Sequence, residues 1–308
     1  MPQTPEPKAD KARFLEGVER VRDTGPDWAQ AIRAKGVSRF AELEFPHRKM
    51  EEWRFTNIAP IVRTPFRSLT GPHTGVSAES IAPFRYEGDW SELVFVDGYF
   101  AKDLSRVPAG IIADSLSDAM TRHSALVESY LGRYLNGTSN AFHALNAAFL
   151  SDGAFVHIPE GVSVETPIHL LFVNTQRDGD TASNPRNLIV LDSGAKAEIV
   201  ETHVCLGEGS RYLTNAVTEI SVGENAHLRL VKFVNESDAG YHLATTKVRI
   251  DRGGNFQSHA ISQTGMIIRN EINVLLDGEG GHCSLNGLYM TSGDQLVDNP
   301  TSVEHAKP

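Results

Sequence analysis

The sequence contains only two cysteines, Cys205 and Cys283, among 308 residues. Two thiols in a chain of this length do not form the disulfide framework that small secreted domains depend on. The opening MPQTPEPKADKARF also lacks the apolar core of a signal peptide. Both features predict a protein of a reducing compartment, and we take the cytoplasm as its location.

Long apolar runs and clustered positive charge are missing as well. The longest apolar runs, such as residues 168–173, fall far short of the roughly 20 residues that a membrane-spanning helix requires. The formal net charge is -10 and the isoelectric point is near 5.6. A nucleic-acid surface needs clustered Lys and Arg to displace counterions. We therefore expect neither a membrane nor a nucleic acid as a partner.

Two common catalytic motifs are absent. The chain has no GxxxxGK[ST] segment, which would cradle nucleotide phosphates, and no GxSxG nucleophile elbow. The glycine-rich stretches 253–255 and 278–281 do not match the calcium-binding nonapeptide repeat, and we interpret them as corners between strands. The sequence thus assigns no catalytic residue.

The first part of the chain has helical patterns. After a polar, proline-rich tail that ends near residue 9, residues 10–22 predict one helix. A second helix is expected to begin at Asp27 and to end at Gly36, because glycine is common just after the last turn. Residues 45–56 predict a surface helix anchored by Trp53.

The next stretch mixes loops with both kinds of element. Residues 64–88 are rich in Pro and Gly and are the best candidate for an internal linker. Residues 93–100 predict a hairpin around Asp97-Gly98, and residues 115–131 predict a further helix. We therefore divide the chain into a helical region (1–88), a mixed entry and cap (89–150) and a strand-rich core (151–308).

The hydrophobic period changes between residues 140 and 173. Phe142, Leu145 and Phe149 recur at helical spacing behind the cap candidates Ser139 and Asn140, and short apolar runs follow. We expect this helix to cover the open end of a stack of strands, where exposed edges would invite aggregation.

A repeated pattern occupies the second half. An apolar strand runs repeatedly into a glycine turn and out into an alternating strand. The glycines recur at intervals of 25 to 33 residues, at positions 161, 194, 223, 253 and 278. Three architectures could contain such a repeat: a sandwich, a propeller and a parallel β-helix. The interval is too short for a propeller blade, and a sandwich has no reason to repeat one turn. Stacked coils of a parallel β-helix fit best, so the fold class is mainly β.

Candidate metal ligands are few. On a strand, His203 and Cys205 point to the same face and could reach one ion, whereas the adjacent His282 and Cys283 should not. The stronger interpretation is that the cysteines are buried thiols and that the histidines are solvated or hydrogen-bonded, with no metal or persulfide role for the four. Carboxylates are scattered over the strands and turns without an evident catalytic pair: Asp192, Glu198, Glu201, Glu219, Asp251, Glu271 and Asp277.

Three segments resemble one known family. The first is RKMEEWRFT at residues 48–56, which resembles an R-x-x-E-x-W-[KR]-[YF]-T segment near the start of SufD proteins. The stretch 140–173, with NAFHALNAAF and IPEGV, resembles the entry to the SufB/SufD core, and DNPTSVEHAKP at 298–308 resembles a later segment of that core. In their joint order, these segments identify the chain as similar to the SufB/SufD family, and most like its SufD branch.

The resemblance implies a right-handed parallel β-helix and a role in iron-sulfur cluster assembly beside SufB and the ATPase SufC. Members of the family continue into a C-terminal helical domain that docks SufC and carries a Cys-x-His segment, whereas this sequence ends at Pro308. No cluster-building residue can therefore be transferred to a position here, and SufC docking is expected to be impaired.

We accordingly expect a scaffold subunit and not an enzyme. It should bind no cofactor stably, although a nascent iron-sulfur cluster could lie at the SufB interface, and without SufB it could form a homodimer. The alternative is a β-helix enzyme that degrades acidic polysaccharide.

Overall fold

The structure, a computed structural model, describes residues 11–107, 110–135, 140–207 and 209–307. The polar tail up to residue 9 and the cap candidate Ser139 lie outside these residues. The helices are α1 (Lys11–Phe14), α2 (Glu19–Arg22), α3 (Asp27–Glu42), α4 (Ala59–Arg63), α5 (Ala78–Ile81), α6 (Leu116–Arg122), α7 (Ser124–Tyr130) and α8 (Ala141–Ala148), with 3-10 turns η1 (Glu51–Trp53), η2 (Ala82–Phe84) and η3 (Lys102–Leu104). In this part of the chain no helix has both the length and the apolarity to cross a membrane.

The strands fall into two sheets, here called sheet A and sheet B. Sheet A runs β16-β14-β12-β10-β8-β5-β4 and also holds β1, β7 and β17; sheet B runs β15-β13-β11-β9-β6-β2-β3. The strands of sheet A are β1 (Arg67–Ser68), β4 (Ile112–Ser115), β5 (Ala154–Ile158), β7 (Thr181–Ser183), β8 (Arg186–Leu191), β10 (Tyr212–Val222), β12 (Tyr241–Ile250), β14 (Ile267–Leu276), β16 (Leu296–Asp298) and β17 (Thr301–His305). Those of sheet B are β2 (Ser91–Val96), β3 (Tyr99–Phe100), β6 (Ile168–Thr175), β9 (Lys196–Leu206), β11 (His227–Asn235), β13 (Asn255–Thr264) and β15 (His282–Tyr289).

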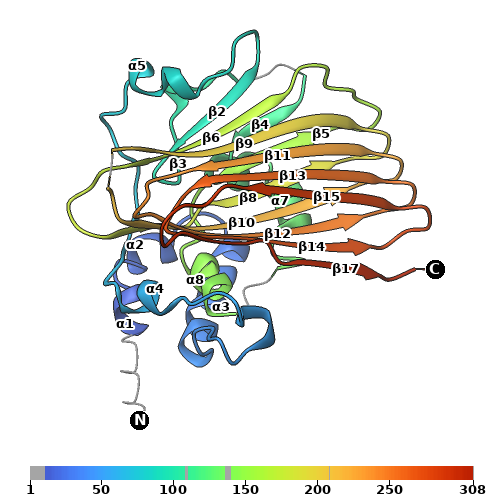
Figure 1. Ribbon diagram of the computed structural model, residues 1–308. Coiled ribbons are helices and arrows are strands. Elements are labelled where there is room, and N and C mark those ends of the chain that lie inside the picture. The colour runs from blue at the N-terminus through green and yellow to red at the C-terminus, as the bar shows by residue number, and fades with distance from the viewer. Residues whose placement is uncertain (1–10, 108–109, 136–139, 208, 308) are drawn as a thin grey trace.

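Successive strands alternate between the sheets and pair in parallel with the strand one coil earlier (Figure 1). This is a β-helix of about five turns between residues 155 and 305. The expected parallel β-helix is therefore confirmed.

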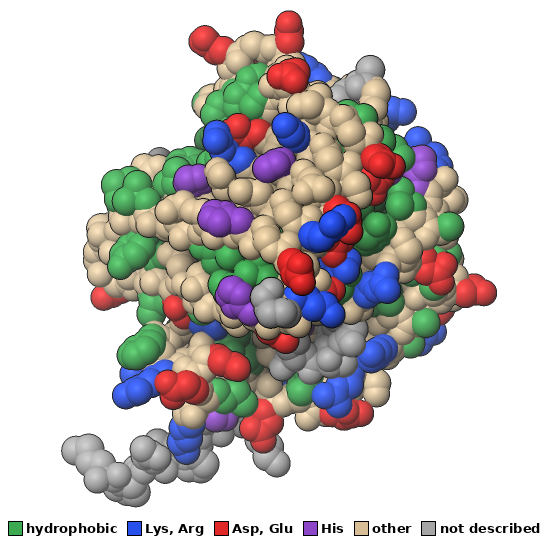
Figure 2. Space-filling model, turned by 90° about the vertical axis from the view of Figure 1, so that its right-hand side faces the viewer, with side chains coloured by type: hydrophobic (Ala, Val, Ile, Leu, Met, Phe, Trp, Pro, Cys, Tyr) green, Lys and Arg blue, Asp and Glu red, His purple; other side chains and the backbone are tan. Residues whose placement is uncertain are grey.

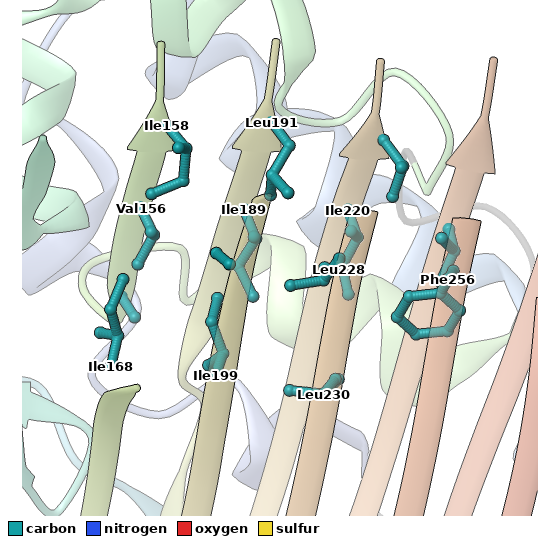
Figure 3. Close-up of a cluster of buried hydrophobic side chains, with 14 of the residues drawn as sticks. Val156, Ile158, Ile168, Ile189, Leu191, Ile199, Ile220, Leu228, Leu230 and Phe256 are labelled. Atoms are coloured by element: carbon teal, nitrogen blue, oxygen red, sulfur yellow. The ribbon is translucent and has the colours of Figure 1, made fainter. Parts of the chain in front are cut away.

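Inward side chains stack from coil to coil between the sheets (Figure 3). Val156 lies opposite Ile189, which lies opposite Ile220, and the same column continues through Val248 and Val274. All five side chains are almost fully buried. One coil could not bury this face alone, so stability accumulates along the axis.

The repeated glycines all lie at one corner of the coils, where sheet A strands turn into sheet B. A residue with positive φ recurs there at Gly161, Gly194, Asn225, Gly253 and Gly280. These corners stack, since each of the first four donates its backbone N–H to a carbonyl of the next corner. The left-handed conformation explains the preference for glycine or asparagine.

Two glycines of the sequence repeat have a different role. A Cβ on Gly223 would lie 2.8 Å from the Leu191 carbonyl oxygen, and one on Gly278 would lie 2.1 Å from the Arg252 nitrogen. The previous coil passes too close for any side chain. Figure 2 shows this side of the molecule, where basic and acidic side chains are interspersed.

The predicted hairpin is confirmed. Strands β2 and β3 pair antiparallel around Asp97 and Gly98, which both have positive φ. Positive φ at both central residues is the requirement of a type I′ turn. The predicted helix at 115–131 is present as α6 and α7, and the Ser115 hydroxyl caps the first of them.

Helix α8 confirms the helix predicted behind Asn140, whose side chain accepts hydrogen bonds from the nitrogens of Phe142 and His143. All eight of its residues are buried. It lies against the outer face of sheet A, where Asn215 Nδ2 donates to the Phe142 carbonyl at 3.0 Å, and α3 covers its other side (Figure 1). It thus covers a sheet face and does not cap the end of the stack.

Gly36 does not end a helix. Helix α3 continues through it to Glu42. A Cβ at Gly36 would lie 2.4 Å from the Ala148 nitrogen of α8. The glycine is needed because the two helix backbones touch there.

Three other predictions are wrong in detail. The helix expected at 10–22 is divided into α1 and α2 around Gly17, whose φ is +85°. Residues 45–56 contain only η1, although Trp53 does anchor them in the core. The linker candidate 64–88 is rich in loops but is fixed to both sheets, through β1 and through the buried Ile81.

We predict that Gly36→Ala destabilises the fold. Alanine favours a helix by roughly 1 kcal/mol over glycine, but here its methyl group would collide with the backbone of α8, and overpacking costs about 1–3 kcal/mol. Urea unfolding followed by circular dichroism should show a net loss of stability. Lys35→Ala, on the exposed side of α3, is the matched control and should be neutral. Equal stability of Gly36→Ala and the wild type would contradict the close approach.

We also predict a loss of stability in mild acid. Burial, together with the charges of Arg186 and Arg269, outweighs Glu271 and lowers the pKa of His143 to about 4, from 6.5. As pH falls below 6.5 the unfolded chain binds this proton first, so stability is complete above 6.5 and is lost towards pH 4, by roughly 3 kcal/mol. His143→Gln should flatten the unfolding free energy across this window. His227→Gln, at an exposed position, should not.

Candidate functional site

The interior of the β-helix is apolar along one side and polar along the other. On β9 the inward positions change from Ala197 and Ile199 to Glu201 and His203. Neighbouring coils add further buried polar groups at this side. Glu201, His203, Lys232, Glu236 and His242 form what we call the interior polar cluster.

Glu201 is shared by two partners. His203 Nε2 lies 2.7 Å from its Oε1 and Lys232 Nζ lies 3.1 Å from the same oxygen. Burial alone would raise the pKa of Glu201, but the charge of Lys232 and the hydrogen bond from His203 outweigh it and lower this pKa to about 2. Burial also lowers the pKa of His203, so its ring is neutral at neutral pH. A neutral ring that donates through Nε2 keeps a lone pair on Nδ1.

Glu236 has a different environment. Its Oε1 accepts hydrogen bonds from Asn174 Nδ2 at 3.0 Å and from the Thr214 hydroxyl at 3.1 Å. His242 Nδ1 lies 3.5 Å from the same oxygen. Within the described part of the chain, no Lys or Arg forms an ion pair with this buried carboxylate.

Several polar atoms of the cluster have no hydrogen-bond partner among the described residues. They are His203 Nδ1, Glu236 Oε2, Glu201 Oε2 and both ring nitrogens of His242. The rings of His203 and His242 are 4.6 Å apart and nearly perpendicular, and Phe172 stacks on the other side of His203. One ligand atom from each of His203, Glu236 and His242 lies within 4.8 Å of the others. Buried polar atoms are usually paired, so such a concentration needs an explanation.

The cluster lies close to the surface at one point. Tyr212 lines an open cavity of about 420 Å³, together with Arg177 and Arg211. The Tyr212 hydroxyl accepts a hydrogen bond at 3.1 Å from the backbone nitrogen of Ser237, which follows Glu236 directly. The two arginines are held by Asp97 and Asp180 respectively.

Of the four residues that the sequence singled out, His203 is buried in the interior. Cys205, two residues further along the same strand, is partly buried at the end of β9, and its thiol donates to the Gly207 carbonyl at 3.4 Å. Burial raises the pKa of Cys205 to about 11, which leaves it a protonated, poorly nucleophilic thiol. Cys283 packs against the apolar core while His282 is exposed, so these two do point apart as expected.

The seven scattered carboxylates are all engaged by basic side chains. Their partners are His157 for Asp192, Arg229 for Glu198, Lys232 for Glu201, Arg186 for Glu219, Arg249 for both Asp251 and Asp277, and Arg269 for Glu271. Most glycoside hydrolases use two carboxyl groups that face the substrate as acid and base or nucleophile. These carboxylates instead tie the strands together.

The three family-like segments meet at one junction on the outer face of sheet A. The Thr56 hydroxyl and the Arg269 guanidinium both donate to the Asp298 carboxylate. Arg269 also stacks over Trp53, 4.0 Å from the ring centre, and Trp53 packs against Phe142 of α8. Residues 242 positions apart in the chain are therefore hydrogen-bonded. The aromatic anchor expected at residues 45–56 serves this junction.

Sequence reasoning missed Glu236 and His242. Glu236 follows strand β11, and nothing in its local pattern distinguishes it from a loop carboxylate. His242 could have been noticed, because Ala244, Val248 and Ile250 on its face of β12 are apolar and only the small polar Thr246 interrupts them. An imidazole side chain on a mostly apolar strand face is the signal that identifies this part of the cluster.

We predict that Asp298→Asn loosens the junction. Arg269 is buried. Removal of the negative charge of Asp298 beside it should lower the free energy of unfolding by roughly 2 kcal/mol. Urea unfolding measures the loss. Glu224→Gln, which removes the charge from the exposed pair with Arg252, should leave stability unchanged, because water screens such a pair. A loss of equal size in both variants would argue against a special role for the junction.

Comparison with known proteins gives two adjoining family matches. The SufBD protein N-terminal region matches residues 12–170, and the SUF system FeS cluster assembly SufBD core domain matches residues 172–308. Among similar proteins, an iron-sulfur cluster assembly SufBD family protein of Synechocystis is 26% identical over 271 residues, 85% of this chain and 59% of that protein. The iron-sulfur cluster assembly protein SufD of Escherichia coli is 23% identical over 306 residues, 95% of this chain and 69% of that protein.

A chloroplastic protein of Arabidopsis thaliana, ABCI7, is 26% identical over 278 residues, 87% of this chain and 57% of that protein. The chain thus spans about three fifths of the length of the Synechocystis and Arabidopsis relatives. The matches to the N-terminal region and to the core follow one another in the order in which the helical elements and the β-helix occur in the structure. The chain belongs to the SufBD family of iron-sulfur cluster assembly proteins.

Proposed function

We propose that the chain is a non-enzymatic scaffold subunit of the SUF iron-sulfur cluster assembly system, and that it pairs with SufB in the cytoplasm. The observation that carries this proposal is the joint match of the N-terminal region and the core over residues 12–170 and 172–308. Escherichia coli SufD, an iron-sulfur cluster assembly protein, aligns with almost the whole chain.

The partner that we propose is SufB, and a second copy of the chain takes its place when SufB is absent.

The scaffold role is supported over polysaccharide cleavage by the state of the carboxylates. The seven on the strands and turns are paired with basic groups, and both thiols have a raised pKa because they are partly buried. In this proposal a nascent cluster is cargo at the SufB interface. SufC is the second partner that we propose; the chain spans about three fifths of the length of the Synechocystis and Arabidopsis relatives.

The test is co-expression with SufB and SufC followed by size-exclusion chromatography, using the chain together with any residues encoded after Pro308. We expect co-elution with SufB. Failure of the wild type to co-elute with SufB would overturn the proposal.

A further inference from the structure

We propose that His203, Glu236 and His242 bind one divalent first-row transition metal ion, such as Zn²⁺ or Fe²⁺, inside the β-helix. The site is formed by strand β9, the turn after β11 and the start of β12, and so by two successive coils. It does not depend on any partner protein.

The donor set fits such an ion. Two imidazole nitrogens and one carboxylate oxygen are the ligands of many zinc sites and of the facial triad that holds Fe²⁺. Ligand atoms of a tetrahedral site with bonds of about 2.0–2.1 Å are about 3.3 Å apart. The three groups here lie within 4.8 Å, so the ligand atoms would have to approach one another by up to about 1.5 Å when the ion binds.

His203 is oriented as a metal ligand. Its Nε2 donates to Glu201 Oε1 at 2.7 Å, and its Nδ1 has no partner among the described residues. A carboxylate that holds the far nitrogen of a ligating histidine fixes the tautomer and raises the basicity of the free nitrogen. Lys232 in turn holds Glu201 at 3.1 Å, so Glu201 serves as a positioning residue and not as a ligand.

The charges also favour a cation at this place. Lys232 balances Glu201, but among the described residues Glu236 receives only the neutral donors Asn174 and Thr214 and the ring of His242. A buried carboxylate without a compensating positive charge is costly. A divalent ion would supply the missing positive charge.

The simpler explanation is a protonated His242 that pairs with Glu236. That pair accounts for one contact of 3.5 Å. It leaves His203 Nδ1, Glu236 Oε2 and His242 Nε2 without partners. A metal ion would engage all three side chains at once, which is why we prefer it.

An ion could enter from the open cavity beside Tyr212. Its hydroxyl is bonded to the nitrogen of Ser237, the residue after Glu236. Tyr212 also lines the open cavity of about 420 Å³, so this cavity is the proposed way in.

The experiment is titration of the metal-free chain with Co²⁺ by absorption spectroscopy, and with Zn²⁺ by calorimetry. It is carried out both on the folded chain and after refolding with the metal. We expect one equivalent to bind, with the visible bands of nitrogen and oxygen ligation and without a sulfur charge-transfer band. Glu236→Gln and His242→Gln should each weaken metal binding by roughly 100-fold or more. Loss of a residue that only hydrogen-bonds a metal ligand typically weakens binding by about 10–100-fold.

His227→Gln is the matched control, because His227 is exposed at the start of β11, and it should bind the metal as the wild type does. Pulsed electron paramagnetic resonance on the Cu²⁺-loaded wild type counts the bound imidazoles and needs no variant that might fail to fold. Two imidazoles are expected. No binding under either condition, one or no imidazole, a sulfur band, or unchanged affinity in folded Glu236→Gln and His242→Gln would each overturn the proposal.

Discussion

The stacking of inward side chains from coil to coil is the constraint on which the rest of the structure depends. Each strand pairs in register with the strand one coil earlier, so like positions such as Ile189 and Ile220 must be compatible along the whole axis. The corner residues obey the same register, with Gly194 and Gly253 in left-handed conformations. A parallel stack of this kind leaves little tolerance for an insertion inside a strand, because one residue would turn every following side chain to the opposite face.

The same register creates the interior polar cluster. Strand β9 supplies apolar residues near one corner of the coil and Glu201 and His203 nearer to the other corner. Its register with the neighbouring strands prevents a shift that would turn these two side chains outward. Burial of these groups opposes folding unless their charges and hydrogen bonds are satisfied. The burial of apolar side chains along the other side of the stack offsets this free-energy cost. One part of the interior therefore stabilises the fold, and the other part is available for chemistry.

The sequence predicts the coils better than the contacts between them. Local signals sufficed for the β-helix, the Asp97-Gly98 turn and the helix behind Asn140, because each depends on residues close together in the chain. Gly36 was assigned to a helix end, since nothing local shows that α8 touches it. His203 was singled out for a partner two residues away, whereas its described neighbours Glu236 and His242 come from the next coil. Such partners depend on register, which a single sequence does not reveal.

The junction of Thr56 with Asp298 also bears on how the chain is made. During synthesis on the ribosome the N-terminal segment emerges long before the residues that hold it, because 242 positions separate the two partners. Pairing over such a distance is slow, and exposed aromatic groups such as Trp53 must wait for it. A nascent chain of this protein therefore carries an unfinished apolar surface through most of its translation.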